Sequence, residues 1–86
     1  MEFALTKYQN YSLLEISGRI DSYTAPKIDN VLHALISENH GNILIDLEKV
    51  SYISSSGILI FVNAQKSLTR KNRGKIHFSG TSKGPG

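Results

Sequence analysis

Three consecutive serines, Ser54–Ser56, interrupt two apolar stretches in the segment "SYISSSGILIF". The apolar run from Ile58 predicts a helix, so the serines fall at its first turn, where backbone N–H groups have no partner within the helix. A serine there can cap the helix, and a phosphate there is stabilised by the same N–H groups and the helix dipole. One serine suffices as a cap, so a second hydroxyl is a candidate acceptor for a phosphoryl group.

Catalysis by the chain itself is not expected. The sequence "SSSG" differs from the G-x-S-x-G nucleophile elbow, and the three histidines, at positions 33, 40 and 77, show no spacing of a triad or a metal site. There is no cysteine, which excludes disulfides, thiolate metal ligands and a cysteine nucleophile. We therefore expect neither an enzyme nor a resident cofactor or metal.

The elements that position the serines can be predicted from hydrophobic periodicity. The segment "FALTKYQNYSLLEISG" indicates two strands joined by a turn at Gln9 and Asn10, and the second strand is apolar enough to lie inside a sheet. The segment "TAPKIDNVLHALISENHG" has helical spacing, with Thr24 as N-cap, Pro26 in the first turn and Gly41 as the stop.

The second half alternates strand and helix. The short run "NILIDL" is typical of a strand covered on both faces, as in a parallel sheet. A helix ending at Gly74 and the strand "KIHFS" follow the serines. The order β-β-α-β-α-β predicts an α/β fold with a mixed, mainly parallel sheet of about four strands and helices packed on it. We expect a single domain over residues 1–79 and a flexible tail at 80–86.

Two loops are expected at one edge of this sheet. The segments 18–23 and 50–57 both leave the carboxyl ends of strands, where sites form in such sheets. If strands 11–17 and 42–47 are parallel neighbours, Asp21 and the serines lie on the same rim.

Charge is distributed unevenly. All seven acidic residues lie in residues 1–48, whereas residues 49–86 hold seven of the ten lysines and arginines. Such asymmetry can mark a nucleic-acid surface, but four of these cations lie in "RKNRGK", where the helix dipole favours them at a helix end. No signal peptide or membrane span of roughly 20 apolar residues is visible. A cytoplasmic protein without direct nucleic-acid or membrane binding is expected.

Two segments together carry a family resemblance. "ILIDLEKVSYISSSGILIFVNAQKSL" and "LLEISGRIDSYTAPKIDNVL" resemble the STAS domain, and specifically the bacterial anti-sigma factor antagonists, in order and spacing over residues 3–79. The resemblance places the family's phosphorylated serine on Ser55. It implies partner binding by the rim residues Asp21, Ser22, Ser54, Ser56 and Gly57. The family often has aspartate before the phosphorylated serine, and this chain has Ser54 there.

The resemblance implies a partner switch. The unphosphorylated protein would bind an anti-sigma factor that is a serine kinase of the histidine-kinase-like ATPase class, which frees a sigma factor. Phosphorylation of Ser55 with the kinase's own ATP would release the partner, and a serine phosphatase would reset the switch. The alternative is a STAS module that is not phosphorylated and docks on a transporter or another regulatory complex.

The resemblance also predicts an uncovered surface. Chains of this family continue past the strand at 75–79 into one or two more helices, which the sequence here does not contain. A sheet edge or face would then lack cover, and copies of the chain could associate through it.

Overall fold

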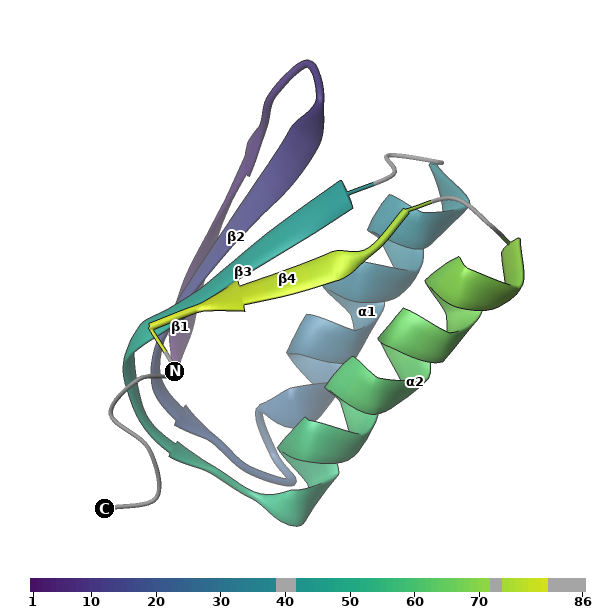
Figure 1. Cartoon of the computed structure of the whole chain (residues 1–86). Helices are drawn as coiled ribbons and strands as arrows, with labels where there is room; N and C mark the ends of the chain where they lie inside the picture. The colour runs from purple at the N-terminus through teal and green to yellow at the C-terminus, as the bar shows by residue number, and fades with distance from the viewer. Residues whose placement is uncertain (39–41, 72–73, 81–86) are drawn as a thin grey trace.

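A computed structural model of the chain describes residues 1–38, 42–71 and 74–80. Four strands form one sheet in the order β1-β2-β3-β4, in which β1 runs antiparallel to β2 and the other neighbours are parallel (Figure 1). The element order β-β-α-β-α-β is the predicted one, with bounds β1 Glu2–Lys7, β2 Tyr11–Ile20, α1 Ala25–Ser37, β3 Asn42–Ile53, α2 Ser55–Lys71 and β4 Ile76–Ser79.

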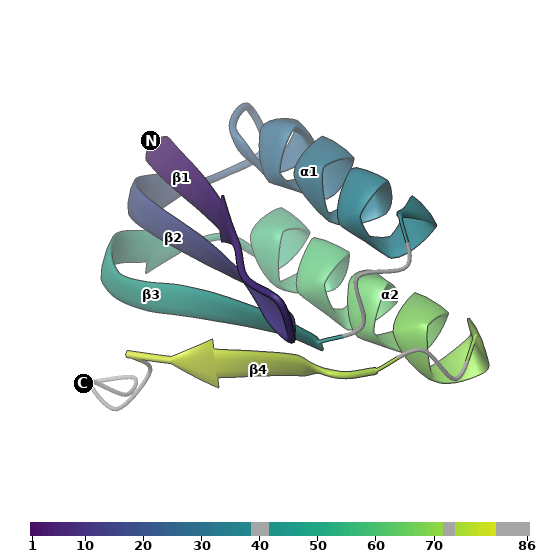
Figure 2. The same cartoon turned by 90° about the horizontal axis from the view of Figure 1, so that it is seen from above.

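Both helices cover the same face of the sheet (Figure 2). The crossovers from β2 to β3 and from β3 to β4 move in the same direction across the sheet, and right-handed crossovers in one direction place their helices on one side. The prediction that the strand "NILIDL" is covered on both faces is therefore wrong. Ile43 and Ile45 point into the core, whereas Leu44 and Asp46 are only half-buried on the open face.

The core lies between this face and the two helices. Alternate residues of the inner strands meet the apolar stripes of α1 and α2. The fully buried side chains, at less than 2% exposure, are Leu14, Ile20, Ile28, Leu32, Leu35, Ile43, Ile45, Leu68 and Ser12. Ser12 is the one polar residue in this set. Its hydroxyl has no hydrogen-bond partner among the described residues.

The two parallel strands next to the serines are longer than predicted. Pairing of β2 with β3 continues through Gly18 opposite Val50 to Ile20 opposite Ile53, past register shifts at 15–17 and 18–19. Gly18 has φ of +88°, which a residue with a side chain rarely adopts, and it allows the strand to continue beyond this irregularity. The predicted loops 18–23 and 50–57 therefore shrink to short connections after Ile20 and Ile53.

Helix boundaries also differ in detail from the prediction. Thr24 occupies the N-cap position of α1, but its side chain makes no cap hydrogen bond. The predicted stop at Gly41 lies outside the described residues, as does the tail after Gly80. In the described segments, no helix is long and apolar enough to cross a membrane.

Candidate functional site

The ends of β2 and β3 join the two loops into one rim, which we define as residues 21–24 and 54–57. The backbone N–H of Ser54 donates to the carbonyl oxygen of Ile20 at 2.8 Å. Both loops lie at the same end of the sheet, beside the start of α2 (Figure 1). The predicted placement of Asp21 and the serines on one rim is confirmed.

The three serines have different structural roles. Ser54 is the cap: its Oγ accepts from the Gly57 N–H at 3.2 Å, and its carbonyl oxygen accepts from the Ile58 N–H at 3.0 Å. Ser55 and Ser56 are the first two residues of α2, and both are exposed. The hydroxyl that capping requires is therefore not the one that the family resemblance assigns to phosphorylation.

Gly57 brings the start of α2 against the strand ends. It is buried, and a Cβ atom at this position would lie 2.7 Å from Cγ2 of Ile20 and 3.0 Å from Cγ2 of Ile53. Carbon atoms pack at about 3.5–4.0 Å, so any side chain would push the helix or the strands away. Glycine at this position allows the first turn of α2, which carries Ser55, to lie close against the ends of β2 and β3.

Asp21 holds its own loop. Its Oδ1 accepts from the backbone N–H groups of Tyr23 at 3.0 Å and Thr24 at 3.1 Å. These two N–H groups, Thr24 first, favour the carboxylate and lower the pKa of Asp21 below its usual value, and the nearby Arg19 guanidinium adds a smaller effect in the same direction. Among the described residues, the side chain of Asp21 makes its hydrogen bonds within the loop, and none of them reaches Ser55.

A second set of hydrogen bonds, made by the Thr24 hydroxyl, also holds the turn before α1. The Thr24 hydroxyl accepts from the Asp21 N–H at 2.9 Å and lies 3.0 Å from the Arg19 carbonyl oxygen, to which it can donate. The sequence pattern predicted that Thr24 alone would cap α1. In the structure, hydrogen bonds of both Asp21 and Thr24 hold the turn before the helix. Ser22 lies between them and is exposed, and it takes no part in these hydrogen bonds.

Two features at the rim were not predicted from the sequence: a contact between Arg19 and Tyr52 beside it, and the exposed ring of Tyr23 within it. The Arg19 guanidinium lies 4.4 Å from the centre of the Tyr52 ring, across the β2–β3 pair. Tyr23, at the tip of the first loop, has 88% of its surface exposed. Alternation of the extended strands could have placed Arg19 beside Tyr52, but only if both strands had been predicted at full length.

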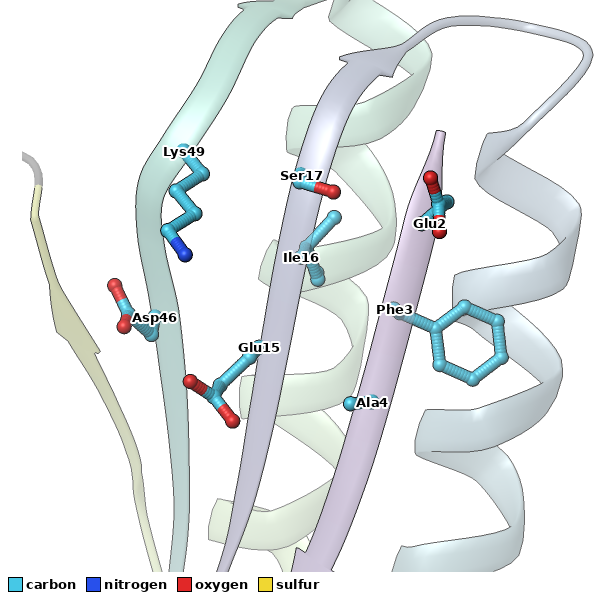
Figure 3. A pocket seen from close by; sticks show the side chains of 8 residues that line it. All are labelled: Glu2, Phe3, Ala4, Glu15, Ile16, Ser17, Asp46 and Lys49. Carbon is cyan, nitrogen blue, oxygen red and sulfur yellow. The ribbon is translucent and has the colours of Figure 1, made fainter.

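The open face of the sheet carries a shallow hollow of about 260 Å³. Figure 3 shows Glu15, Asp46 and Lys49 on this side, whereas Phe3 points the other way. The hollow shares no residue with the rim; its lining is Glu2, Phe3, Ala4, Glu15, Ile16, Ser17, Asp46 and Lys49. Among the described residues, no group of three or more His, Cys, Asp or Glu side chains is placed to hold a metal ion.

The chemistry that this rim supports is acceptance of a phosphoryl group by the Ser55 hydroxyl. An exposed hydroxyl at the first position of a 17-residue helix is accessible, and the helix N-terminus stabilises negative charge placed on it.

Comparison with known proteins identifies the protein family of the chain. Residues 2–85 match the STAS domain family. The chain belongs to this family, and its four-stranded mixed sheet with two helices is the STAS fold.

Its relatives within the family include antagonists of anti-sigma factors. The anti-sigma-B factor antagonist of Staphylococcus aureus is 29% identical over 77 residues, which cover 90% of this chain and 70% of that protein. The corresponding protein of Listeria monocytogenes is 38% identical over 63 residues, covering 73% and 55% of the two chains. Such antagonists are regulators rather than enzymes, in agreement with the prediction from the sequence.

The fold is also that of SpoIIAA, an anti-sigma factor antagonist solved in two states. Its unphosphorylated form aligns with a TM-score of 0.78 at 18% identity, over 90% of this chain and 71% of that one. The phosphorylated form of Bacillus SpoIIAA aligns with a TM-score of 0.75 at 18% identity, over 87% and 68%. At this identity the alignment establishes a common fold.

Proposed function

We propose that this protein is a cytoplasmic anti-sigma factor antagonist that works as a partner switch, with Ser55 as its phosphorylated residue. The observation that carries this proposal is that the serine that caps α2 and the serine that is available for phosphorylation are different residues. Ser54 is occupied as the helix cap, and Ser55 is exposed at the first position of α2. The phosphorylated form of the structural neighbour SpoIIAA supports phosphorylation as the regulatory chemistry of this fold.

In the unphosphorylated state, the rim binds an anti-sigma factor and frees the sigma factor that it held. The contact surface includes Ser22, Ser55 and Ser56, which are exposed, around the loop that Asp21 holds in shape. An aspartate is ionised at neutral pH, and the hydrogen bonds that lower the pKa of Asp21 hold its carboxylate in the charged form. The rim therefore presents hydroxyls beside one fixed negative charge.

Phosphorylation changes the charge of this surface without refolding it. The anti-sigma factor is itself the serine kinase: transfer of the γ-phosphoryl group from ATP to Ser55 Oγ releases ADP and the hydroxyl proton. The new group adds about −1.5 to −2 charges. The α2 N-terminus stabilises that charge within the chain, whereas a closely packed partner must desolvate it. Each ~1.4 kcal/mol of cost weakens binding tenfold, and a serine phosphatase restores the binding form.

The decisive experiment is an intact-mass measurement with ATP and each anti-sigma factor kinase encoded in the same genome. The wild type should gain one phosphoryl group, Ser55→Ala should gain none while still binding the kinase, and Ser55→Asp should bind weakly. Ser56→Ala is the matched control and should be phosphorylated like the wild type. An unchanged Ser55→Ala reaction would refute the site, and a folded wild type that no kinase modifies would favour a docking module that is not phosphorylated.

A further inference from the structure

The outer surface of α2 has a regular arrangement that begins at Ser55. A helix turns 100° per residue, so residues spaced by three and four lie on one side. Ser55, Leu59, Val62 and Lys66 follow each other at spacings of four, three and four, and Ile58 lies beside them. We call Ser55, Ile58, Leu59, Val62 and Lys66 the α2 row.

The middle of the α2 row is apolar and uncovered. Ile58, Leu59 and Val62 are 54%, 57% and 43% exposed. They lie opposite the stripe of Phe61, Ala64 and Leu68 that packs into the core. Single exposed apolar side chains are ordinary, but three within two turns of one helix, next to the serine proposed for phosphorylation, form an apolar patch of the kind that binds another protein.

The far end of the row is basic. Lys66 and Arg70 are exposed, and the sequence of α2 contains no Asp or Glu. A complementary surface therefore combines apolar side chains with carboxylates. A second copy of the chain would bring the same cations and no carboxylate from its own α2 row, so a different protein matches this surface better.

We propose that the α2 row is the docking surface for the anti-sigma kinase, whose contacting surface is apolar and carries a carboxylate against Lys66. This inference rests on the proposed function and specifies the partner's chemistry. At 1.5 Å per residue, Lys66 lies about 16 Å along the helix from Ser55. The partner's carboxylate should be about that far from its phosphoryl-transfer site.

The proposal separates docking from phosphoryl acceptance. Leu59 and Val62 supply contact area, whereas Ser55 at the end of the same row supplies the reacting hydroxyl. Loss of the apolar contacts should raise KM for phosphorylation and leave kcat largely unchanged, because these contacts exist equally in the ground and transition states.

The test is steady-state phosphorylation by the kinase that modifies the wild type, with the variant Leu59→Gln/Val62→Gln. Glutamine favours helix and both sites are exposed, so the fold should persist. We expect KM to rise about tenfold or more, as for apolar contacts at the centre of an interface. Leu5→Gln, which removes an exposed leucine from the distant strand β1, is the matched control and should leave KM unchanged.

Charge is tested separately with Lys66→Glu. It should raise KM at low salt and make KM less dependent on salt. Lys49→Glu makes the same change of charge on the open face of the sheet and should have little effect.

Three outcomes would overturn the docking proposal. An unchanged KM for Leu59→Gln/Val62→Gln, with the wild type still phosphorylated, would refute the α2 row and leave the proposed function standing. A wild-type dimer that this variant dissolves would assign the row to a second copy. Failure of every kinase to modify the wild type would remove both proposals.

Discussion

The amide of Ser54 and the carbonyl of Ile20 form the last hydrogen bond between the paths of β2 and β3, at 2.8 Å. Ser54 is also the cap of α2, through its Oγ and the Gly57 N–H. One residue therefore ends the strand pairing and begins the helix. The position of Ser55 at the rim, directly after Ser54, follows from this junction.

The cap at Ser54 should be measurable as stability. Ser54→Ala leaves the Gly57 N–H without its partner, and we expect a loss of about 1 kcal/mol in the free energy of unfolding. Ser54→Asp should retain most of the stability, because aspartate caps equally well. Urea unfolding would measure both, with Ser56→Ala as the control expected to change stability by less than about 0.5 kcal/mol. Equal losses for Ser54→Ala and Ser56→Ala would contradict the assignment.

Gly57→Ala should destabilise the protein despite the better helix propensity of alanine. The gain in propensity is at most about 1 kcal/mol, whereas overpacking against Ile20 and Ile53 costs about 1–3 kcal/mol. Ile20→Leu removes the β-branched methyl that a Cβ would meet at 2.7 Å. A double-mutant cycle should show that Ile20→Leu partly rescues Gly57→Ala; additive losses would mean that the close approach is relieved elsewhere.

Asp21 should make stability depend on pH in the acid range. Its pKa is lowered in the folded state, so its contribution is fully present above about pH 4, the pKa of an unfolded aspartate, and disappears as the pH falls through the folded value. Asp21→Asn keeps an oxygen that can accept from the Tyr23 and Thr24 N–H groups but removes the titration. Urea midpoints between about pH 2 and 6 should therefore fall less steeply in this variant. Identical pH profiles would show that the loop does not depend on the charge.

Ser12→Ala should stabilise the protein. The Ser12 hydroxyl is fully buried on β2 and has no partner within the described residues, so folding removes it from water without replacing its hydrogen bonds. We expect a gain of about 1 kcal/mol in the free energy of unfolding, measured by urea or heat. Ser17→Ala, on the half-buried part of the same strand, should be close to neutral. A loss of stability in Ser12→Ala would mean that the hydroxyl has a partner after all.

The succession of elements was predictable because periodicity and turn residues were clear. The two N-terminal strands, both helices and the late strand lie where "FALTKYQNYSLLEISG", the apolar helix stripes and "KIHFS" indicated. The full lengths of β2 and β3 were not predictable. Gly18 suggested a loop, whereas in the structure it pairs with Val50 and β2 continues past it to Ile20.

The site was predictable in position but not in the roles of its residues. Parallel neighbours explain why Asp21 and the serines share a rim, and the pattern indicated that one serine would cap the helix. Which serine caps is decided by the path of the chain after Ile53, and that path depends on the Ile20 contact. The one-sided cover of the sheet follows from strand order, which local periodicity does not contain.

The edge strand β1 should be less stable against local opening than the rest of the domain. All six of its residues are exposed, and it pairs with β2 alone in the sheet. Detaching it would uncover little of the core, so the amide protons that join β1 to β2 should exchange with deuterium through a local opening, whereas those that join β2 to β3 should exchange only on global unfolding. The strand β1 would then open independently of a smaller cooperative unit that is formed by β2, β3, β4 and the two helices. This unit alone would hold the rim in place.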